Sequence, residues 1–332
     1  MEKKLTALVT GASGFVGSTL CEELIRRGLE TRALMRKTSS NANLGAASIV
    51  PVQGDLRQAE GLEKAVQGVD LIFHVAGVVS AKNREDFFSA NAEGTRNLLD
   101  AVRRSGSRPK RFIYVSSLAA AGPSKPDRPN LEGDACNPVS DYGFSKLAGE
   151  QAVLDCRSEL SVCIVRPPAV YGPRDRGIYT FFQAIQAGFL PLLGMEKPDP
   201  RRYSFVHVDD LVQGIVKSAL VEQVASGEVF YISGDQEFSW EEAMRLISNG
   251  LEKRAIPLRL PIFAMKGAGA LCSAFSKASG KVLPFSLDKV KEIEALAWTC
   301  SNKKAKDLLG FEPYWTLERG ISHTARWYRE NG

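Results

Sequence analysis

A tyrosine and a lysine stand four positions apart in the stretch SDYGFSKLAGE, and together they could transfer a proton. Tyr142 and Lys146 would share one face of a helix, because residues i and i+4 are neighbours there. A phenol has a reference pKa of about 10, which is too high for easy proton exchange near neutral pH. An ammonium group within roughly 4–6 Å favours the phenolate and lowers that pKa. The pair is therefore a candidate for general acid–base catalysis, and an ordinary surface pair is the alternative.

The glycine-rich stretch VTGASGFVG is a second candidate site. Gly11, Gly14 and Gly17 follow an apolar run, KLTALVT, and precede an amphipathic pattern, FVGSTLCEELIRRG. This order predicts a buried strand, a turn and a helix. Glycines there let the backbone approach a pyrophosphate, and the helix N-terminus offers unpaired N–H groups. The stretch predicts a dinucleotide-binding turn, in which Ser13, Phe15 and Val16 are further expected contacts.

The end of the second predicted strand, TRALM, bears on which nicotinamide cofactor binds. Arg36 and Lys37 follow this strand without a carboxylate. A carboxylate there would bond a free ribose 2′-hydroxyl, whereas a basic residue suits a 2′-phosphate. We therefore expect NADP(H) to be preferred, with NAD(H) and a pair of solvated loop charges as the alternatives. Asp55 could accept a hydrogen bond from the adenine amino group or could serve as a cap. The other predicted cofactor contacts are Leu56, Ala76, Gly77, Tyr142, Lys146 and Pro167.

Six apolar runs alternate with helical patterns over about 165 residues: KLTALVT, TRALM, SIVPVQGD, VDLIFHVAG, RFIYVSS and SVCIVRP. Regular alternation indicates a parallel sheet covered on both faces. We predict an α/β fold, a Rossmann-type doubly wound parallel sheet with a smaller mixed α/β substrate domain. Its expected domains are residues 1–172 with 203–232 returning to it, and residues 173–202 with 233–332.

Three helices are predicted in some detail. LRQAEGLEKAVQG reads as one helix, and EDFFSANAEGTRNLLDAVRRSG reads as one long amphipathic helix. Ser239 and Glu242 have the spacing of a capping box, which predicts that a helix starts at WEEAMRLISNG.

Taken together, these motifs resemble those of the extended short-chain dehydrogenase/reductase family, the NAD-dependent epimerase/dehydratase superfamily. The family's T-G-x-x-G-x-x-G is Thr10 to Gly17, its Y-x-x-x-K is Tyr142 to Lys146, and its N-x-x-G-T-x-N is NAEGTRN. RPPAVYGPRD and FVHVDDL match later landmarks, and WTCSNKKAKDLLGFEP resembles the tail of 3β-hydroxysteroid dehydrogenase-like members. The chain also resembles the dihydroflavonol reductase-like members of this family.

The resemblance implies an enzyme and assigns roles to its residues. Ser117 lies 25 residues before Tyr142, where the family has its catalytic serine, and Ser116 is the fallback. Tyr142 would give a proton to a carbonyl oxygen while the nicotinamide gives a hydride to the carbon. Lys146 would lower the pKa of the phenol and bond the nicotinamide ribose.

The substrate is expected to be an apolar small molecule, which is steroid-like, aryl or acyl. Nucleotide-sugar enzymes of the family carry a phosphate-holding arginine just before the VHV motif, where this chain has Tyr203, and Arg201 and Arg202 are displaced. The apolar segment 256–285 could line a pocket, contact a membrane surface or form a core. Two alternatives stay open: a nucleotide-sugar epimerase or dehydratase, and a non-catalytic NADP-binding sensor or scaffold. Candidate pocket residues are Val79, Ser116, Asn91, Pro168, Val170 and Tyr203.

The bulk composition narrows the partners and the compartment. The 332 residues carry a net charge of +5 without a basic block, so no nucleic-acid partner is expected. No uninterrupted apolar stretch is long enough to span a membrane, and the six cysteines form no C-x-x-C pair. We expect free thiols, no metal, a cytoplasmic location and, as the resemblance implies, a homodimer. His74 is expected to be structural or to line the pocket, and Asp209 and Asp210 to begin a helix.

Overall fold

The computed structural model describes residues 4–40, 42–45, 48–283 and 285–331. Some predicted ranges extend beyond them: the first domain was expected to begin at residue 1, the apolar segment 256–285 includes Pro284, and the last domain was expected to end at residue 332.

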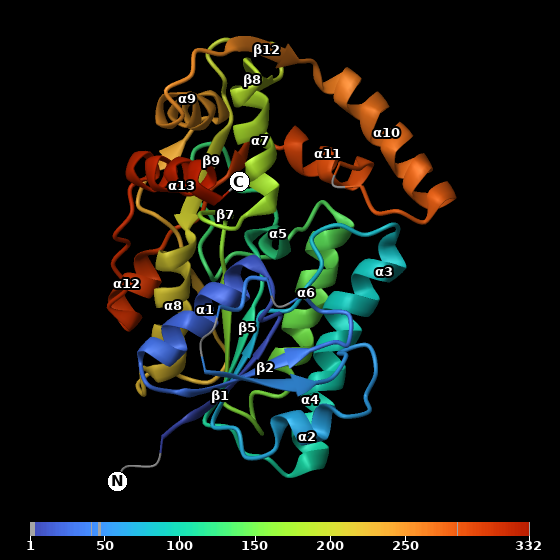
Figure 1. Ribbon diagram of the computed structural model, residues 1–332, viewed down its shortest axis with the longest axis vertical. Helices are drawn as coiled ribbons and strands as arrows, with labels where there is room; N and C mark the ends of the chain where they lie inside the picture. Colours follow the sequence, from blue (N-terminus) through green and yellow to red (C-terminus); the bar gives the residue numbers. More distant parts are fainter. Residues whose placement is uncertain (1–3, 41, 46–47, 284, 332) are drawn as a thin grey trace.

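A seven-stranded sheet forms the lower layers of the molecule (Figure 1). Its strands are β1 (Thr6–Thr10), β2 (Glu30–Met35), β3 (Ile49–Gln53), β4 (Leu71–His74), β5 (Arg111–Val115), β6 (Val162–Arg166) and β10 (Glu228–Tyr231). The strand order is β10-β6-β5-β4-β1-β2-β3, and every pairing is parallel. All five residues of β1, β5 and β6 are buried, because helices cover both faces. The predicted α/β fold is confirmed.

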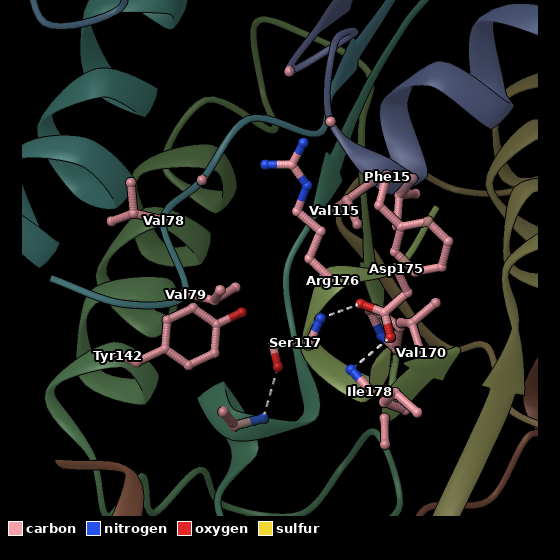
Figure 2. A pocket seen from close by; sticks show the side chains of 18 of the residues that line it. Phe15, Val78, Val79, Val115, Ser117, Tyr142, Val170, Asp175, Arg176 and Ile178 are labelled. Carbon is pink, nitrogen blue, oxygen red and sulfur yellow. Dashed lines mark hydrogen bonds between the residues drawn. The ribbon is translucent and has the colours of Figure 1, made fainter. Parts of the chain in front are cut away.

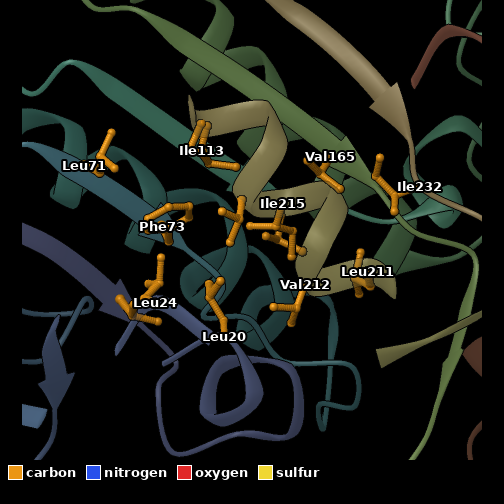
Figure 3. Close-up of a cluster of buried hydrophobic side chains, with 14 of the residues drawn as sticks. Leu20, Leu24, Leu71, Phe73, Ile113, Val165, Leu211, Val212, Ile215 and Ile232 are labelled. Carbon is orange, nitrogen blue, oxygen red and sulfur yellow. The ribbon is translucent and has the colours of Figure 1, made fainter. Parts of the chain in front are cut away.

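Helices on the two faces of this sheet create separate apolar cores. The sheet's helical elements are α1 (Phe15–Arg26), α2 (Leu62–Val66), α3 (Arg84–Phe88), the π-helical turn η1 (Ser89–Glu93), α4 (Gly94–Ser105), α5 (Leu118–Ala121), α6 (Asp141–Leu154) and α8 (Val208–Leu220). On one face, Leu20 and Leu24 of α1 join Ile215 of α8 against Phe73 (Figure 3). On the other face, Leu98 of α4 belongs to a second buried cluster.

Two helices differ from their predicted form. The helix expected at LRQAEGLEKAVQG begins only at Leu62, because Gly61 before it has a φ of 84° and breaks the helical path. The long helix expected at EDFFSANAEGTRNLLDAVRRSG is divided into α3, η1 and α4, with a π-helical turn between the two α-helices. Residue periodicity alone does not reveal such a turn, and π-helical turns often mark functional sites.

The upper part of the molecule is built around two smaller sheets (Figure 1). A small sheet contains β7 (Ala169–Tyr171), β9 (Arg202–His207), β11 (Glu237–Phe238) and β13 (Ala297–Trp298), and β8 (Phe189–Leu193) pairs with β12 (Ile256–Leu260). Its helices are α7 (Arg176–Gln186), α9 (Trp240–Gly250), α10 (Ile262–Ser279), α11 (Leu287–Glu294), α12 (Lys303–Leu309) and α13 (Leu317–Asn331). The predicted capping box of Ser239 and Glu242 starts α9. Residues 203–232 divide between layers: β9 joins the small sheet, and β10 joins the large one.

Three further features of the described residues concern partners. All six cysteines are free thiols. Among the described residues, no group of histidine, cysteine and acidic side chains could hold a metal ion. The same residues include no helix that is long and apolar enough to cross a membrane.

Candidate active site

A cavity of about 1540 Å³ opens at the carboxyl ends of the parallel strands, next to the crevice between β1 and β4. At this point the strand order reverses, and open α/β sheets bind their ligands there. Pockets for a single drug-sized ligand measure roughly 300–1,000 Å³. The cavity therefore has room for a dinucleotide together with a second molecule.

Tyr142 and Lys146 both line the cavity from α6, as their spacing predicts. The helix starts locally because the Ser140 side chain accepts a hydrogen bond from the Gly143 N–H at 3.0 Å. Figure 2 shows the half-buried Tyr142 ring at the cavity, on the same side as Ser117. Lys146 lies deeper, where its Nζ donates to the Val115 carbonyl at 2.8 Å.

Burial controls the protonation of this pair. It raises the pKa of Tyr142 to about 12, although a hydrogen bond with the Ser117 side chain opposes the rise. Burial also lowers the pKa of Lys146 to about 7, opposed by the nearby Glu150 carboxylate. Near neutral pH the amine is thus only partly charged. In the protein without cofactor, the expected lowering of the phenol's pKa by Lys146 is outweighed by desolvation.

Ser117 and Ser116 follow β5, and both line the cavity. Ser117 caps α5, and its Oγ accepts a hydrogen bond from the Ala119 N–H at 3.1 Å (Figure 2). Its hydroxyl hydrogen is still available to a substrate oxygen. Ser116 is buried, and its Oγ has no hydrogen-bond partner among the described residues.

Asn91 supports the site without lining the cavity. From the π-helical turn, its Oδ1 accepts from the Val78 N–H at 2.8 Å, and its Nδ2 donates to the Val78 carbonyl at 3.0 Å and to Ser145 Oγ at 2.9 Å. Asn91 thereby ties the loop after β4 to the helix that carries Tyr142. Val79, the next residue of that loop, lines the cavity and is 72% exposed.

The glycine turn forms the floor of the cofactor half. A Cβ on Gly17 would overlap the Gly11 carbonyl oxygen, and Gly11 has a φ of 69°, so both positions require glycine. The N-terminus of α1 has no side-chain cap, which leaves its first N–H groups for an anion. This cradle fits a pyrophosphate. The predicted contacts that line the cavity with it are Ser13, Gly14, Phe15, Val16, Leu56, Ala76, Gly77 and Pro167.

Charged and polar side chains surround the end of the cavity beyond β2. Arg36 lines it, whereas the predicted contact Lys37 is not among the lining residues. Asp55 lines it too, but its carboxylate already accepts from Arg57, at 3.0 Å from the backbone N and 3.1 Å from Nη2. Sequence reasoning missed Arg57, Ser39, Ser40 and Asn43. Their polarity was visible in the sequence, but nothing there indicated that their loops meet.

The substrate half is apolar. Tyr203, Pro168 and Val170 line it, as predicted. The segment 256–285, for which a pocket wall was one of the expectations, contributes Leu260, Ala264, Met265, Ala268 and Phe285. The lining residues that the sequence did not indicate include Ile178, Phe181, Pro191, Leu193, Trp240, Ile293 and Trp298. Neither Arg201 nor Arg202 is among the lining residues, and the buried Arg201 bonds Asp199 at 3.1 Å instead. Three cations line this part of the cavity: Arg174, which pairs with Glu22, Lys289, which pairs with Glu292, and Arg176 from the first turn of α7, which Figure 2 labels.

Carboxylates from α11 cap the helix that carries the candidate catalytic pair. Asp288 accepts hydrogen bonds from the backbone N–H groups of Asp141 at 2.7 Å and Tyr142 at 3.3 Å. Glu292 accepts from Ser140 Oγ at 2.7 Å and also lines the cavity. These contacts span about 150 residues of sequence, so no local pattern could have indicated them.

The histidine and aspartates outside this cavity have structural roles. His74 is fully buried between the hydroxyls of Thr10 at 2.7 Å and Thr95 at 2.9 Å. Burial lowers the pKa of His74 to about 3, so its ring stays neutral. Asp210 accepts from the backbone N–H groups of Tyr314 and Trp315, each at 3.0 Å.

A doubly wound sheet with a glycine turn, beside a serine, a tyrosine and a lysine at one cavity, defines the class of dinucleotide-dependent oxidoreductases and epimerases. A family model described as the NAD dependent epimerase/dehydratase family matches residues 7–233. The chain therefore belongs to this family, the extended short-chain dehydrogenase/reductases, and is an NAD(P)-dependent enzyme.

Two curated relatives and one solved structure illustrate the range of similar proteins. The chain is 32% identical to a ceramide reductase of Caulobacter vibrioides, over 98% of this chain and 94% of that protein. It is 28% identical to a 3-beta-hydroxysteroid dehydrogenase of Mycolicibacterium neoaurum, over 97% and 91%. It superimposes with a TM-score of 0.80 on UDP-glucuronic acid 4-epimerase from Bacillus cereus, solved with UDP-glucuronic acid and NAD, at 21% identity over 98% and 99% of the chains. The last likeness concerns the fold alone.

Proposed function

We propose that the protein interconverts a ketone and a secondary alcohol on an apolar small molecule, with an acyl or steroid-like body. The observation that carries this proposal is the substrate half of the cavity, whose lining is mostly aliphatic and aromatic, with the charged side chains of Arg174, Asp175, Arg176, Lys289 and Glu292 among it. Apolar walls with a few convergent polar groups are typical of sites for such ligands. The names of two relatives, a ceramide reductase and a 3-beta-hydroxysteroid dehydrogenase, point to substrates of this kind.

In the direction of reduction, Ser117 donates a hydrogen bond to the substrate carbonyl oxygen, and the Tyr142 hydroxyl transfers its proton to that oxygen. A nicotinamide cofactor held by the glycine turn and Lys146 would supply the hydride to the carbonyl carbon, so that the C=O group would become CH–OH. Lys146 stabilises the resulting phenolate once its amine is charged. A nearby anionic cofactor favours the charged amine, which would reverse the effect of burial on Lys146. In oxidation, Tyr142 accepts the hydroxyl proton.

NADP(H) is the cofactor we propose as preferred. Arg36 lines the cavity after β2, and no ion pair to it is found among the described residues, so its guanidinium can meet a 2′-phosphate. Ser39, Ser40 and Asn43 line the same end and offer further donors.

An epimerase acting on a nucleotide sugar is the second candidate function. Arg176 in the cavity favours it, since this cation could hold a diphosphate. Against it, a diphosphate in the apolar half would lose hydration that Arg201 and Arg202 do not replace.

A thermal-shift panel separates the two functions. With NADPH present, we expect steroid, aryl-ketone and acyl-ketone ligands to raise Tm in a concentration-dependent way, as binding linkage requires. UDP- and dTDP-sugars should leave Tm unchanged. Stabilisation by the nucleotide sugars alone would favour the epimerase.

We also propose that the protein is located in the cytoplasm, a reducing compartment. We further propose that it forms a homodimer. Phe144 on α6 is 40% exposed, and Arg84 of α3 lies 5.3 Å from its ring. A second copy could cover this face, which is formed by α3 and α6, the two helices through which members of the family often pair. Sedimentation of the wild type and of Phe144→Glu tests the dimer, which the variant should dissociate.

A further inference from the structure

Helix α10 lies at the edge of the molecule, angled over α11 and away from the sheet (Figure 1). Its inner side is a narrow stripe of three buried residues, Met265, Gly269 and Ser276. This stripe packs closely on α11, because a Cβ on Gly269 would come within 3.0 Å of Val290. Helix α10 therefore packs closely against the rest of the protein along one side only.

The outer side of α10 is apolar, which is unusual for a surface helix. Phe263, Leu271 and Phe275 are 78%, 74% and 53% exposed. At 3.6 residues per turn, Phe263 and Leu271 point away from the stripe that packs on α11, together with exposed Gly267, Ala274 and Ala278, and Phe275 lies at the edge of this outer face. A surface helix normally places polar residues there. No described residue covers this face.

All charged residues of the segment that contains α10 are cations. Residues 256–285 contain Arg259, Lys266, Lys277 and Lys281 and no aspartate or glutamate. Arg259 is paired with Glu241 at 2.7 Å and Lys266 with Glu294 at 2.5 Å. At the C-terminal end of α10, Lys82 approaches Gly280, with its Nζ 3.9 Å from where a Cβ would be. Lys82, Lys277 and Lys281 thus form a cationic end to an apolar helix.

These charges distinguish between possible occupants. A second copy packed on this face through its own α10 would offer these lysines no carboxylate from that segment, which contains only cationic charged residues. An anionic bilayer satisfies both features, because headgroups attract the ammonium groups while the acyl boundary accepts the phenyl and leucyl side chains.

One edge of the same helix lines the cavity. Ala264, Met265 and Ala268 belong to its substrate half, within one or two turns of Phe263 and Leu271 on the outer face. We propose that α10 docks the enzyme on anionic membranes and opens the apolar half of the cavity to lipid, so that the substrate is a membrane-resident amphipathic lipid. The docking proposal depends only on the outer face of α10, whereas the proposal of substrate delivery rests on the proposed function.

Co-sedimentation of the full-length protein with vesicles tests the docking. The probes are phosphatidylcholine vesicles with and without about one third phosphatidylglycerol, which sets the negative surface potential. We expect the wild type to bind the anionic vesicles, and Leu271→Ser/Phe275→Ser to weaken binding roughly 10- to 100-fold through lost apolar contact. Lys277→Glu/Lys281→Glu should weaken it by at least roughly 5-fold per position, and only on anionic vesicles.

A matched control distinguishes docking from general stickiness. Leu308 on α12 is 51% exposed, close to the value for Phe275, so Leu308→Ser should bind vesicles like the wild type. Unchanged Tm and NADPH affinity show that each variant folds. Docking is overturned if the wild type stays in the supernatant with anionic vesicles, or if Leu308→Ser loses as much binding as the α10 variant. It is also overturned if the α10 variant instead dissociates an oligomer without lipid, since a second copy would then be the occupant.

Substrate delivery has its own measurement. We expect the α10 double variant to reduce a long-chain ketone embedded in vesicles at least about 10-fold more slowly in kcat/KM, and a short water-soluble ketone at the wild-type rate. Equal loss on both ketones overturns the delivery step. If no ketone is reduced by the wild type, the proposed function fails while the vesicle result still decides docking.

Discussion

The two halves of the cavity are built in opposite ways. The cofactor half consists of backbone and short side chains at the ends of neighbouring buried strands, and much of it lies between Thr10 and Gly77 in sequence. The substrate half consists of large side chains on α7, β8, α9, α10 and α11, which are joined only by folding. Residues close together in the sequence therefore form the cofactor half. The substrate half depends on packing between elements that are far apart in the sequence.

Burial follows the same division. Leu8 and Val9 of β1 and Ile113 of β5 are fully buried, whereas α10 presents Phe263 and Leu271 to its surroundings at more than 70% exposure. Local opening takes place where few buried contacts hold an element. We therefore expect amide exchange to be fastest in α10 and slowest in β1 and β5.

The largest effect on turnover should come from removing the Tyr142 hydroxyl, the proposed proton donor between the two halves of the cavity. Tyr142→Phe is expected to lower kcat roughly 10²–10⁴-fold, the range for one positioned acid, with NADPH affinity unchanged. Steady-state rates and a fluorescence titration measure the two quantities. The matched control is Tyr314→Phe, whose side chain is 64% exposed and outside the cavity lining. A Tyr142→Phe enzyme with near wild-type turnover would contradict the assignment.

The cofactor half alone should respond to Arg36→Ala. Loss of a charge-assisted contact of about 1.5–3 kcal/mol corresponds to a roughly 10- to 150-fold weaker Kd for NADPH, with NADH unaffected. Lys37→Ala is the matched control, because Lys37 is adjacent and does not line the cavity. An equal loss in both variants, or equal affinity of the wild type for both cofactors, would contradict our interpretation of this strand end.

The substrate half alone should respond to Phe181→Ala. Truncating a partly buried phenyl ring removes contact with an apolar substrate, and we expect KM to rise roughly 3- to 10-fold with no change in cofactor Kd. Phe189→Ala is the control, since Phe189 is 51% exposed on β8 and does not line the cavity. A change in NADPH affinity instead would show that the halves are not separable at this residue.

The smallest effect concerns stability and depends on pH. The pKa of Lys146 in the folded protein, about 7, lies below the ordinary lysine value of 10.5, so the unfolded chain binds more protons between these values. Wild-type unfolding free energy should therefore gain from this group as pH rises from about 7 towards 10.5. Lys146→Met should stabilise the cofactor-free protein most below pH 7, where the buried ammonium is fully charged. Urea unfolding at several pH values, with Lys110→Met as control, measures the difference; an advantage that does not shrink with rising pH would contradict it.

Much of the fold could be predicted from the sequence because its determinants are local. Each strand of the large sheet from β1 to β6 lies in an apolar run, and the Ser239 capping box requires only a four-residue spacing. The same holds for the glycine turn and for Tyr142 and Lys146, whose helical spacing is enough to place them on one face.

The rest of the site depends on contacts that no local pattern contains. The π-helical turn that orients Asn91 changes helix register by a single residue, which periodicity over a long amphipathic segment does not detect. Phe181, Trp240 and Trp298 look like ordinary core residues in the sequence, and only contacts between distant elements bring them to the cavity. Desolvation of Lys146 is likewise a property of the assembled structure, so its low pKa could not be predicted from spacing.

The capping of α6 by Asp288 has a consequence for how such enzymes can be recombined. A segment that lines the apolar half of the cavity also supplies the carboxylate that accepts hydrogen bonds from the first backbone N–H groups of α6. Exchanging residues 256–298 for those of another member of the family would replace this part of the cavity lining and, with it, the helix cap. A chimera therefore keeps a well-ordered Tyr142 only if the donor segment places an acceptor at the position of Asp288. The residues that line the substrate half and the first turn of α6 therefore have to be exchanged together.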